Sequence, residues 1–432
     1  MKPILTTVLL GLFLTNGVFP QNTNLQMGVS KINITPTDSI YLSGYGGMYS
    51  HRYTNRVNDS LYCRVTALKK ENKKIVFIST DLIGSYFYEE VYAELFKNFK
   101  LKPEEVFLTA IHTHSAPAFT FSEKDRNTYN YAYTKELVDG INTAVKRALS
   151  DTKEVNVSIG SGYAPIGVNR RQLNFDLNAF PQDGGFVKLG INPEGITNNR
   201  ITLIKFRPLH TDNSSSFFEF GCHARSQSPS SQVITGDFFG IAEQRAERIL
   251  NNTVMSGFAG PSGDIDPPFV VGDIVHTSNS IPETELLGQM LAQELVRSYQ
   301  SAQNRLEITG IMSTYKSIDL PSRRRDEYIS NDSIPKTPLH LTTSSLSEDI
   351  VFVGIGAEVA VAIGNEIKNA SPFKHTFIFT HCNGGEGYLS PKEFYKERGY
   401  EVLHSPYGPE AGDIVIKSIL EELYTQHKKQ KK

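Results

Sequence analysis

The sequence is poor in cysteine, with only Cys63, Cys222 and Cys382 among 432 residues. Their spacing resembles neither a zinc knuckle nor a redox pair, which argues against a small cysteine-bound zinc module and a thiol redox site. We expect buried free thiols. The alternative is a disulfide between Cys222 and Cys382, because both lie next to candidate site residues.

Two common hydrolase signatures are also missing. The chain has no Gly-X-Ser-X-Gly elbow, which argues against a serine hydrolase. It has no His-Glu-X-X-His motif, which argues against a common metalloprotease. Neither an internal repeat nor a low-complexity linker divides the sequence, so we expect a single domain over residues 21–432.

An excess of one charge and long apolar runs are absent as well. The formal net charge is −2 with both signs interspersed, so we expect no nucleic-acid partner, which a basic face would attract. The apolar run at 4–14 follows Lys2 and is too short to span a bilayer, but it fits a signal peptide over residues 1–20. We therefore expect no transmembrane span and a protein exported to a periplasm or beyond.

Apolar periodicity predicts an α/β fold. Between residues 75 and 160, strands are predicted at 75–78, 106–111 and 155–159, and helices at 86–99 and 133–149. This alternation predicts parallel strand pairs with helices on the sheet faces.

The second half of the chain is less regular. Further strands are predicted at 201–206, 217–222, 351–355 and 376–380. Helices are predicted from Asp237, as the N-cap, to Leu250 and from Pro282 onward. The polar stretch 321–345 predicts a long surface excursion.

Histidines and a carboxylate follow four of these strands. His112 and His114 follow the strand at 106–111, and we expect them on one side because residues i and i+2 of a strand share a face. His223, Glu358 and His381 follow three other strands. Open α/β sheets bind ligands at such strand ends, and two or three histidines with one carboxylate form a catalytic zinc site. The alternative is a set of hydrogen-bonded histidines without a metal.

Several motifs occur in the order of a known family. The two most specific are His112-Thr113-His114-Ser115 before Pro117, and Tyr388-Leu389-Ser390-Pro391 before Tyr400-Glu401. Weaker matches are Gly28 to Pro36, Gly44-Tyr45, Asn169-Arg170-Arg171, His223 with Gly236-Asp237, and Glu358 with Gly364. From about Gly28 to Pro409 the chain resembles the neutral/alkaline non-lysosomal ceramidases, as a short, divergent member matching their N-terminal catalytic domain.

The resemblance implies a fold, a cofactor and roles for particular residues. The implied fold is α/β, with mixed β-sheets flanked by helices, and we expect no C-terminal immunoglobulin-like domain because the chain ends soon after the tyrosine motif. The implied cofactor is Zn²⁺, with the ligands His112, His223, Glu358 and Tyr388. His114 and Tyr400 are implied to be catalytic, and Arg170, with Asn169, to bind substrate.

Two residues need separate interpretation. The position of His381 after a strand suggests a ligand, whereas the family pattern selects Tyr388, so we place His381 beside the ligands. Asp266 stands where the family has a serine. Its carboxylate could act as a general base or orient a ligand histidine, so we count Asp266 as catalytic.

These features predict a secreted or periplasmic zinc-dependent amidohydrolase. By the resemblance it acts like a ceramidase and converts N-acyl sphingosine to a fatty acid and a sphingoid base. One alternative is a zinc-dependent deacylase, deacetylase or esterase acting on another lipid or glycan. Another is a non-catalytic glycan- or lipid-binding protein. The expected partner is a small-molecule or lipid substrate with an N-acyl group, reached through transient contact with a membrane surface.

Overall fold

The computed structural model describes residues 24–46, 50–173, 186–268, 281–323, 336–385 and 387–431. The predicted signal peptide lies outside these residues. Within them, no helix has both the length and the apolar character needed to cross a bilayer.

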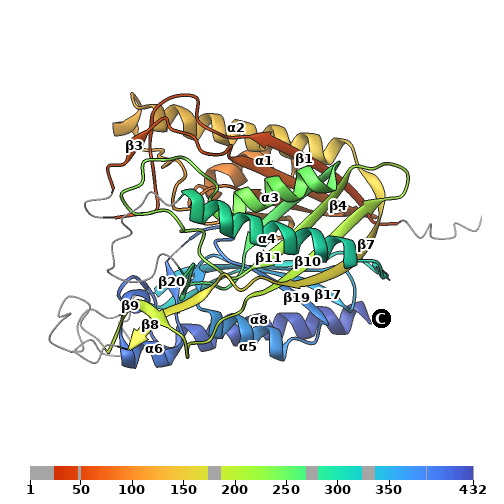
Figure 1. The fold of residues 1–432 in the computed structure, drawn as a ribbon. Helices are drawn as coiled ribbons and strands as arrows, with labels where there is room; N and C mark the ends of the chain where they lie inside the picture. Colours follow the sequence, from red (N-terminus) through yellow and green to blue (C-terminus); the bar gives the residue numbers. More distant parts are fainter. Residues whose placement is uncertain are drawn as a thin grey trace, which may run out of the picture.

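A nine-stranded mixed sheet runs through the middle of the molecule (Figure 1). Its order is β12-β11-β10-β7-β1-β4-β5-β6, with the short β14 paired to β7. The strands are β1 (Gln26–Asn33), β4 (Tyr62–Lys70), β5 (Lys73–Thr80), β6 (Val106–Ala110), β7 (Lys153–Tyr163), β10 (Arg200–Pro208), β11 (Ser214–Phe220), β12 (Thr253–Ala259) and β14 (Arg305–Leu306). The pairs β5–β6 and β11–β12 are parallel. The first confirms the predicted parallel pairing for the strands at 75–78 and 106–111, whereas the third predicted strand, β7, pairs antiparallel with β1 and β10.

A second sheet of four strands packs against the first. Its order is β15 (Met312–Pro321), β16 (Lys336–Ser345), β17 (Ile350–Ile355) and β19 (His375–Phe379), and β17 and β19 are parallel. Shorter strands lie near the ends of these sheets: β8 (Val168–Leu173), β9 (Val187–Asn192), β13 (Ile265–Asp266), β18 (Glu358–Val359) and β20 (Tyr388–Leu389). A further pair joins β2 (Ile40–Tyr41) to β3 (Tyr53–Thr54).

Helices cover the outer faces of both sheets, which gives a layered helix–sheet–sheet–helix arrangement (Figure 1). The nine-stranded sheet is covered by α1 (Tyr88–Phe99), α2 (Tyr129–Ser150), α3 (Asp237–Leu250) and α4 (Ile281–Ser301). The four-stranded sheet is covered by α5 (Val361–Ala370) and α8 (Ala411–Gln430). The short helices α6 (Lys392–Glu397) and α7 (Tyr400–Leu403) follow β20.

Phenylalanines fill the space between the two sheets. We call this group the aromatic layer, and its members are Phe77, Phe107, Phe217, Phe258, Phe352, Phe377 and Phe379. The strands that carry it are buried on both faces because one face meets the other sheet and the other face meets helices. Every residue of β6, β11 and β17 is buried, as expected for strands of a sheet that is covered on both sides.

The prediction of a surface excursion at 321–345 is wrong for its second part. Residues 336–345 form β16, which pairs with both β15 and β17. Hydroxyl side chains caused the error, because this strand ends in buried threonines and serines whose partners lie across the sheet: Thr343 bonds Thr314 at 2.7 Å and Ser344 bonds Ser313 at 2.9 Å. Residues 324–335 lie outside the described residues.

The start of α3 also differs slightly from expectation. Gly236 is the N-cap, and Asp237 is the first helical residue, with a φ of 56°. The Asp237 carboxylate accepts hydrogen bonds from the backbone N–H and hydroxyl of Ser226 at 2.9 and 2.6 Å. Asp237 therefore ties the helix start to the loop after β11, and its carboxylate also accepts from the N–H of Phe238 at 2.7 Å.

Candidate metal centre

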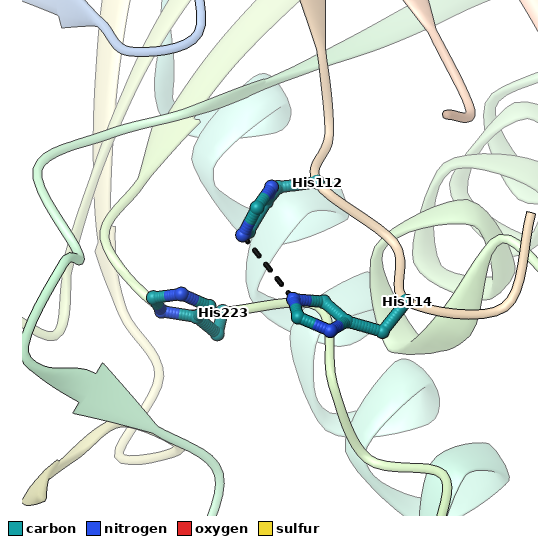
Figure 2. Close-up of side chains that lie close together, drawn as sticks. All are labelled: His112, His114 and His223. Carbon is teal, nitrogen blue, oxygen red and sulfur yellow. Dashed lines mark hydrogen bonds between the residues drawn. The ribbon is translucent and has the colours of Figure 1, made fainter. Parts of the chain in front are cut away.

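The predicted ligand residues meet at one end of the two sheets. His112 follows β6, His223 follows β11, Glu358 follows β17 at the start of β18, and His381 follows β19. With His114 they form a buried group that we call the histidine–carboxylate cluster. Figure 2 shows the rings of His112, His114 and His223 turned toward one another.

The backbone conformation that brings His112 and His114 together differs from the predicted strand. β6 ends at Ala110, and His112 adopts a φ of 65°, so the two histidines lie in a turn and not in a strand. Their Nε2 atoms still approach to 3.2 Å. Gly44 packs closely against this turn. A Cβ at position 44 would lie only 2.6 Å from the Cα of His114, so a larger residue does not fit there.

The hydrogen bonds of His112 and His223 show where their lone pairs point. The Nδ1 of His112 lies 2.6 Å from the carbonyl of Ile83, and the Nδ1 of His223 lies 2.8 Å from that of Ser262. A carbonyl only accepts, so each Nδ1 carries a proton, and in the neutral ring each Nε2 therefore carries a lone pair. This arrangement is typical of metal-binding histidines, whose other nitrogen is held by a backbone carbonyl or a carboxylate.

The carboxylate of Glu358 faces both of these lone pairs. Its Oε2 lies 3.5 Å from the Nε2 of His112 and 3.3 Å from the Nε2 of His223. Burial lowers the pKa of His223, which favours its neutral form. Neutral histidine lone pairs aimed at a carboxylate repel it unless a cation lies between them, so these residues fit a divalent metal ion.

His114 lies beside this arrangement and differs from the other histidines. Burial, with smaller contributions from His112 and Arg225, places its pKa well below its usual value. Because the Nε2 of His112 carries a lone pair, the Nε2 of His114 must donate to it. The Nδ1 of His114 is buried without a hydrogen-bond partner among the described residues. His114 is therefore a neutral imidazole with hydrogen-bonding capacity left over inside the site.

Tyr388 is joined to Glu358 because β20 pairs with β18 at these two residues. Its hydroxyl lies 3.1 Å from the Nη2 of Arg170. Burial, and then the charge of Glu358, raise the pKa of the Tyr388 phenol well above its usual value, although Arg170 opposes both effects. Arg170 is thus the residue that would stabilise an ionised Tyr388.

Asp266 is held by two arginines. Its carboxylate lies 3.2 Å from the Nη1 of Arg170 and 3.5 Å from the Nη2 of Arg225. Burial alone would raise its pKa, but Arg225 and Arg170 lower it below the usual value. The Oδ1 also lies 4.0 Å from the Nδ1 of His223. An ionised, doubly paired carboxylate is a weak base, so the geometry favours a positioning role over proton abstraction.

Tyr400 and Asn169 complete the set of predicted site residues. The Tyr400 ring lies 5.8 Å from that of Tyr388, and the Cζ of Arg170 lies 5.5 Å from it. The amide nitrogen of Asn169 donates to the carbonyl of Ile196 and to Asp264, each at 3.0 Å. Asn169 therefore orients the strand that carries Arg170, and its substrate-binding role stays a prediction.

Sequence reasoning gave no role to Arg225 and Glu401. The Cζ of Arg225 lies 5.9 Å from the centroid of the Tyr45 ring, and Arg225 follows His223 by two residues, as His114 follows His112. That repeated spacing is the signal that would have found it. The carboxylate of Glu401 pairs with Arg170 at 2.8 Å and with Arg171 at 2.6 Å.

The three cysteines are free and buried, which confirms the expectation of free thiols. The alternative of a disulfide between Cys222 and Cys382 is therefore wrong. Burial raises the pKa of both thiols well above the usual value, so neither is a reactive thiolate near neutral pH.

The fold and the cluster together define a class: layered α/β proteins with a histidine–carboxylate centre at the C-terminal ends of their strands. The family profile described as neutral/alkaline non-lysosomal ceramidase, N-terminal, matches residues 25–280. The chain belongs to this family and is a ceramidase-like hydrolase, which confirms the resemblance read from its motifs.

Solved structures show the same fold. The crystal structure of neutral ceramidase from Pseudomonas aeruginosa has a TM-score of 0.74 at 18% identity, covering 94% of this chain and 75% of that one. A ceramidase complexed with C2 has a TM-score of 0.74 at 17% identity, covering 94% and 76%. No curated protein matches the sequence. The predicted fold class, mixed sheets flanked by helices as in these ceramidases, is confirmed.

Proposed function

We propose that this protein is a zinc-dependent hydrolase of the C–N amide bond of an N-acyl sphingosine. The observation that carries the proposal is the pair of histidine Nε2 lone pairs, from His112 and His223, facing the buried carboxylate of Glu358. This donor set, with a position left over, is typical of catalytic zinc sites.

The residues that would hold the zinc are His112, His223 and Glu358, with Tyr388 as the fourth ligand implied by the family pattern. The chemistry that bound zinc supplies is Lewis-acid activation of water and of the substrate carbonyl. Tyr388 contributes a hydroxyl that lies 3.1 Å from the Nη2 of Arg170, and this guanidinium would stabilise the ionised form of the phenol.

The remaining site residues bind and orient the substrate in this proposal. Burial keeps His114 neutral, and if zinc took up the Nε2 lone pair of His112, the Nε2–H of His114 that now points to it would be free to donate to the amide oxygen. Tyr400 adds a second hydroxyl near Tyr388. Arg170 is fixed by Asp266 and Glu401, so its position does not depend on the substrate.

The lipid character of the substrate rests on family membership and on the likeness to a ceramidase complexed with C2. We propose that the protein meets its substrate through transient contact with a membrane surface, after export directed by residues 1–20. Immunodetection in cell fractions tests the export: we expect mature protein that has lost these residues, outside the cytoplasm. Full-length protein retained in the cytoplasm would contradict it.

The test of the activity is release of fatty acid from a fluorescent N-acyl sphingosine by the purified mature protein. We expect release that a zinc chelator abolishes and that added zinc restores. We also expect His223→Ala to lack both zinc and activity, whereas His375→Ala, which removes a histidine distant from the cluster along β19, keeps both. Absence of release from a zinc-loaded protein would move the substrate to another amide or ester, and Asp266 is the first residue to examine for the reason.

A further inference from the structure

Tyr400, which the family pattern implies to be catalytic, is not held in place by its own hydroxyl. This hydroxyl makes no hydrogen bond within the described part of the chain, which leaves it available to a substrate. The side chain is half-buried, so its position depends on the groups that pack against its ring. Two of these groups belong to the site already described: the Tyr388 ring centroid lies 5.8 Å and the Arg170 Cζ 5.5 Å from the Tyr400 ring centroid.

A third group, the imidazole of His404, lies closer to the Tyr400 ring than either of these. The two ring centroids are 4.0 Å apart, and the ring planes meet at 32°. Tyr400 is the first residue of the single-turn helix α7, and His404 is its C-cap. Residues i and i+4 of a helix are neighbours on one face, so α7 itself brings the two rings together.

Hydrogen bonds hold the imidazole of His404 in this place. The carbonyl of Tyr400 accepts from the backbone N–H of His404 at 3.0 Å, and the Nδ1 of His404 lies 2.9 Å from the same oxygen. A carbonyl only accepts, so this Nδ1 carries a proton and donates it. The imidazole is therefore tied to the backbone of the same residue whose ring it covers.

Arginines anchor the backbone of α7 on the far side of Tyr400. The carboxylate of Glu401 pairs with Arg170 at 2.8 Å, and the carbonyl of Val402 accepts from the Nη1 of Arg323 at 2.5 Å. With the helix held in this way, the two side-chain torsions of Tyr400 are what remains to be set. A ring packed on the phenol restricts both of them.

We propose that His404 is a positioning residue for Tyr400: its imidazole packs on the phenol ring and holds the hydroxyl where it meets the substrate. The inference rests on the proposed function, since it takes Tyr400 to act in the hydrolysis. It gives a role to an exposed histidine that neither the sequence motifs nor the metal centre uses.

Steady-state kinetics of three variants separate the ring contact from the imidazole nitrogens. We expect His404→Ala to lower kcat about tenfold with KM within about twofold, because a displaced catalytic group weakens transition-state stabilisation more than substrate binding. His404→Phe keeps a flat ring beside Tyr400 and should retain kcat within about threefold. His404→Gln keeps polar atoms without a ring and should behave like His404→Ala. The matched control is Leu403→Ala, which removes a neighbouring side chain that is 40% exposed and should leave both constants unchanged.

A second measurement does not depend on activity: the fluorine NMR resonance of a fluorotyrosine placed at position 400 alone. We expect His404→Ala to move this resonance toward its value in the unfolded protein, and His404→Phe to keep it displaced from that value. Zinc content and the midpoint of urea unfolding should stay at the wild-type values in every variant, because the His404 side chain is exposed.

Two results would overturn the inference. One is a resonance and a kcat that His404→Ala leaves unchanged, and the other is an equal loss of kcat in His404→Phe and His404→Ala. If the wild-type protein shows zinc-dependent hydrolysis in either case, only this inference fails. If the wild-type protein does not hydrolyse N-acyl sphingosine, the proposed function fails, and the resonance still decides whether His404 holds the Tyr400 ring.

Discussion

The same strands carry two very different regions, the aromatic layer and the histidine–carboxylate cluster. Three strands contribute a phenylalanine to the layer and, a few residues later, lead to a histidine of the cluster: Phe107 and His112, Phe217 and His223, and Phe379 and His381. In the layer, rings satisfy one another, with Phe258 and Phe379 stacked at 4.1 Å. No hydrogen bond is needed there.

In the cluster, the contacts are incomplete and the backbone is strained. The Nδ1 atoms of His114 and His381 are buried without partners among the described residues, and His112 and His381 have positive φ. Such a group opposes folding by itself. The comparison indicates that the layer supplies the stability that holds the cluster in place, and mutations in the two regions should separate stability from activity.

The largest expected effect is on stability, from Phe77→Ala in the aromatic layer. Phe77 is 1% exposed, and its ring lies 4.8–4.9 Å from those of Phe107, Phe217 and Phe352. We expect the free energy of unfolding to fall by about 4 kcal/mol, because the change leaves a cavity in a packed core. Urea unfolding measures this loss, and activity per folded molecule should be retained.

The control for this change is Phe96→Ala. Phe96 is 49% exposed, so its loss should alter stability by less than about 0.5 kcal/mol. Equal effects of the two substitutions would contradict the importance of the layer.

The next effect is on activity, from His112→Ala in the cluster. Loss of this imidazole should lower zinc-dependent hydrolysis by more than about 100-fold, since replacing even an outer partner of a metal ligand costs roughly 10–100-fold. Zinc content measured by atomic absorption should fall together with activity. The metal-free protein should lose a little stability, because the change removes the hydrogen bond from Nδ1 to the carbonyl of Ile83 and leaves the positive φ at position 112 in place. A full equivalent of zinc in both His112→Ala and His223→Ala would refute the ligand assignment.

The contrast between the aromatic layer and the histidine–carboxylate cluster also explains which parts of the fold the sequence could predict. Buried strands such as β6 and β17 are continuous apolar runs, so periodicity found them. β16 was missed because four of its six buried residues are threonines and serines, and the hydroxyls of Thr343 and Ser344 bond across the sheet. A count of apolar residues does not register burial of this kind. The pairing of β7 with both β1 and β10 also depends on contacts between segments far apart in the sequence.

For the site, position after a strand was the useful signal. His112, His223, Glu358 and His381 all follow strands, and the structure brings them together. The arginine network was not predictable in this way, because Asp266 and Arg225 become partners only when β13 meets the loop after β11. The sequence left Asp266 as either a general base or a residue that orients a ligand histidine, and its two arginine partners favour a positioning role.

A smaller effect, and one that depends on pH, is expected for the ion pairs beside the cluster. Burial alone would raise the pKa of Glu401, but Arg170 and Arg171 lower it below the usual value. Its ionised form therefore contributes stability above the unfolded pKa of about 4.3, and this contribution is lost as the pH falls through the lower folded value. Glu401→Gln should lower the free energy of unfolding at pH 7 by about 2 kcal/mol and flatten its decline below pH 4.5.

Glu397→Gln is the matched control for this pH dependence. Its carboxylate also pairs with Arg171, at 3.0 Å, but its side chain is 45% exposed. We expect a change of less than about 1 kcal/mol and an acid profile like that of the wild-type protein. If Glu401→Gln keeps the wild-type acid profile as well, the buried pairs do not control acid stability.

The smallest expected effect comes from Asp266→Ser, which restores the residue of the family pattern. Serine cannot hold both guanidinium groups, so Arg170 and Arg225 lose a shared anchor while the metal ligands remain. We expect kcat/KM for N-acyl sphingosine to fall about tenfold with zinc content unchanged, as for a positioning residue. Asp266→Asn keeps one acceptor oxygen, so its kcat/KM should lie between those of the wild-type protein and Asp266→Ser. If neither variant changes any measured rate, Asp266 lies outside the reacting centre, and the functional region ends closer to the proposed zinc ligands than the arginine partners of Asp266 suggest.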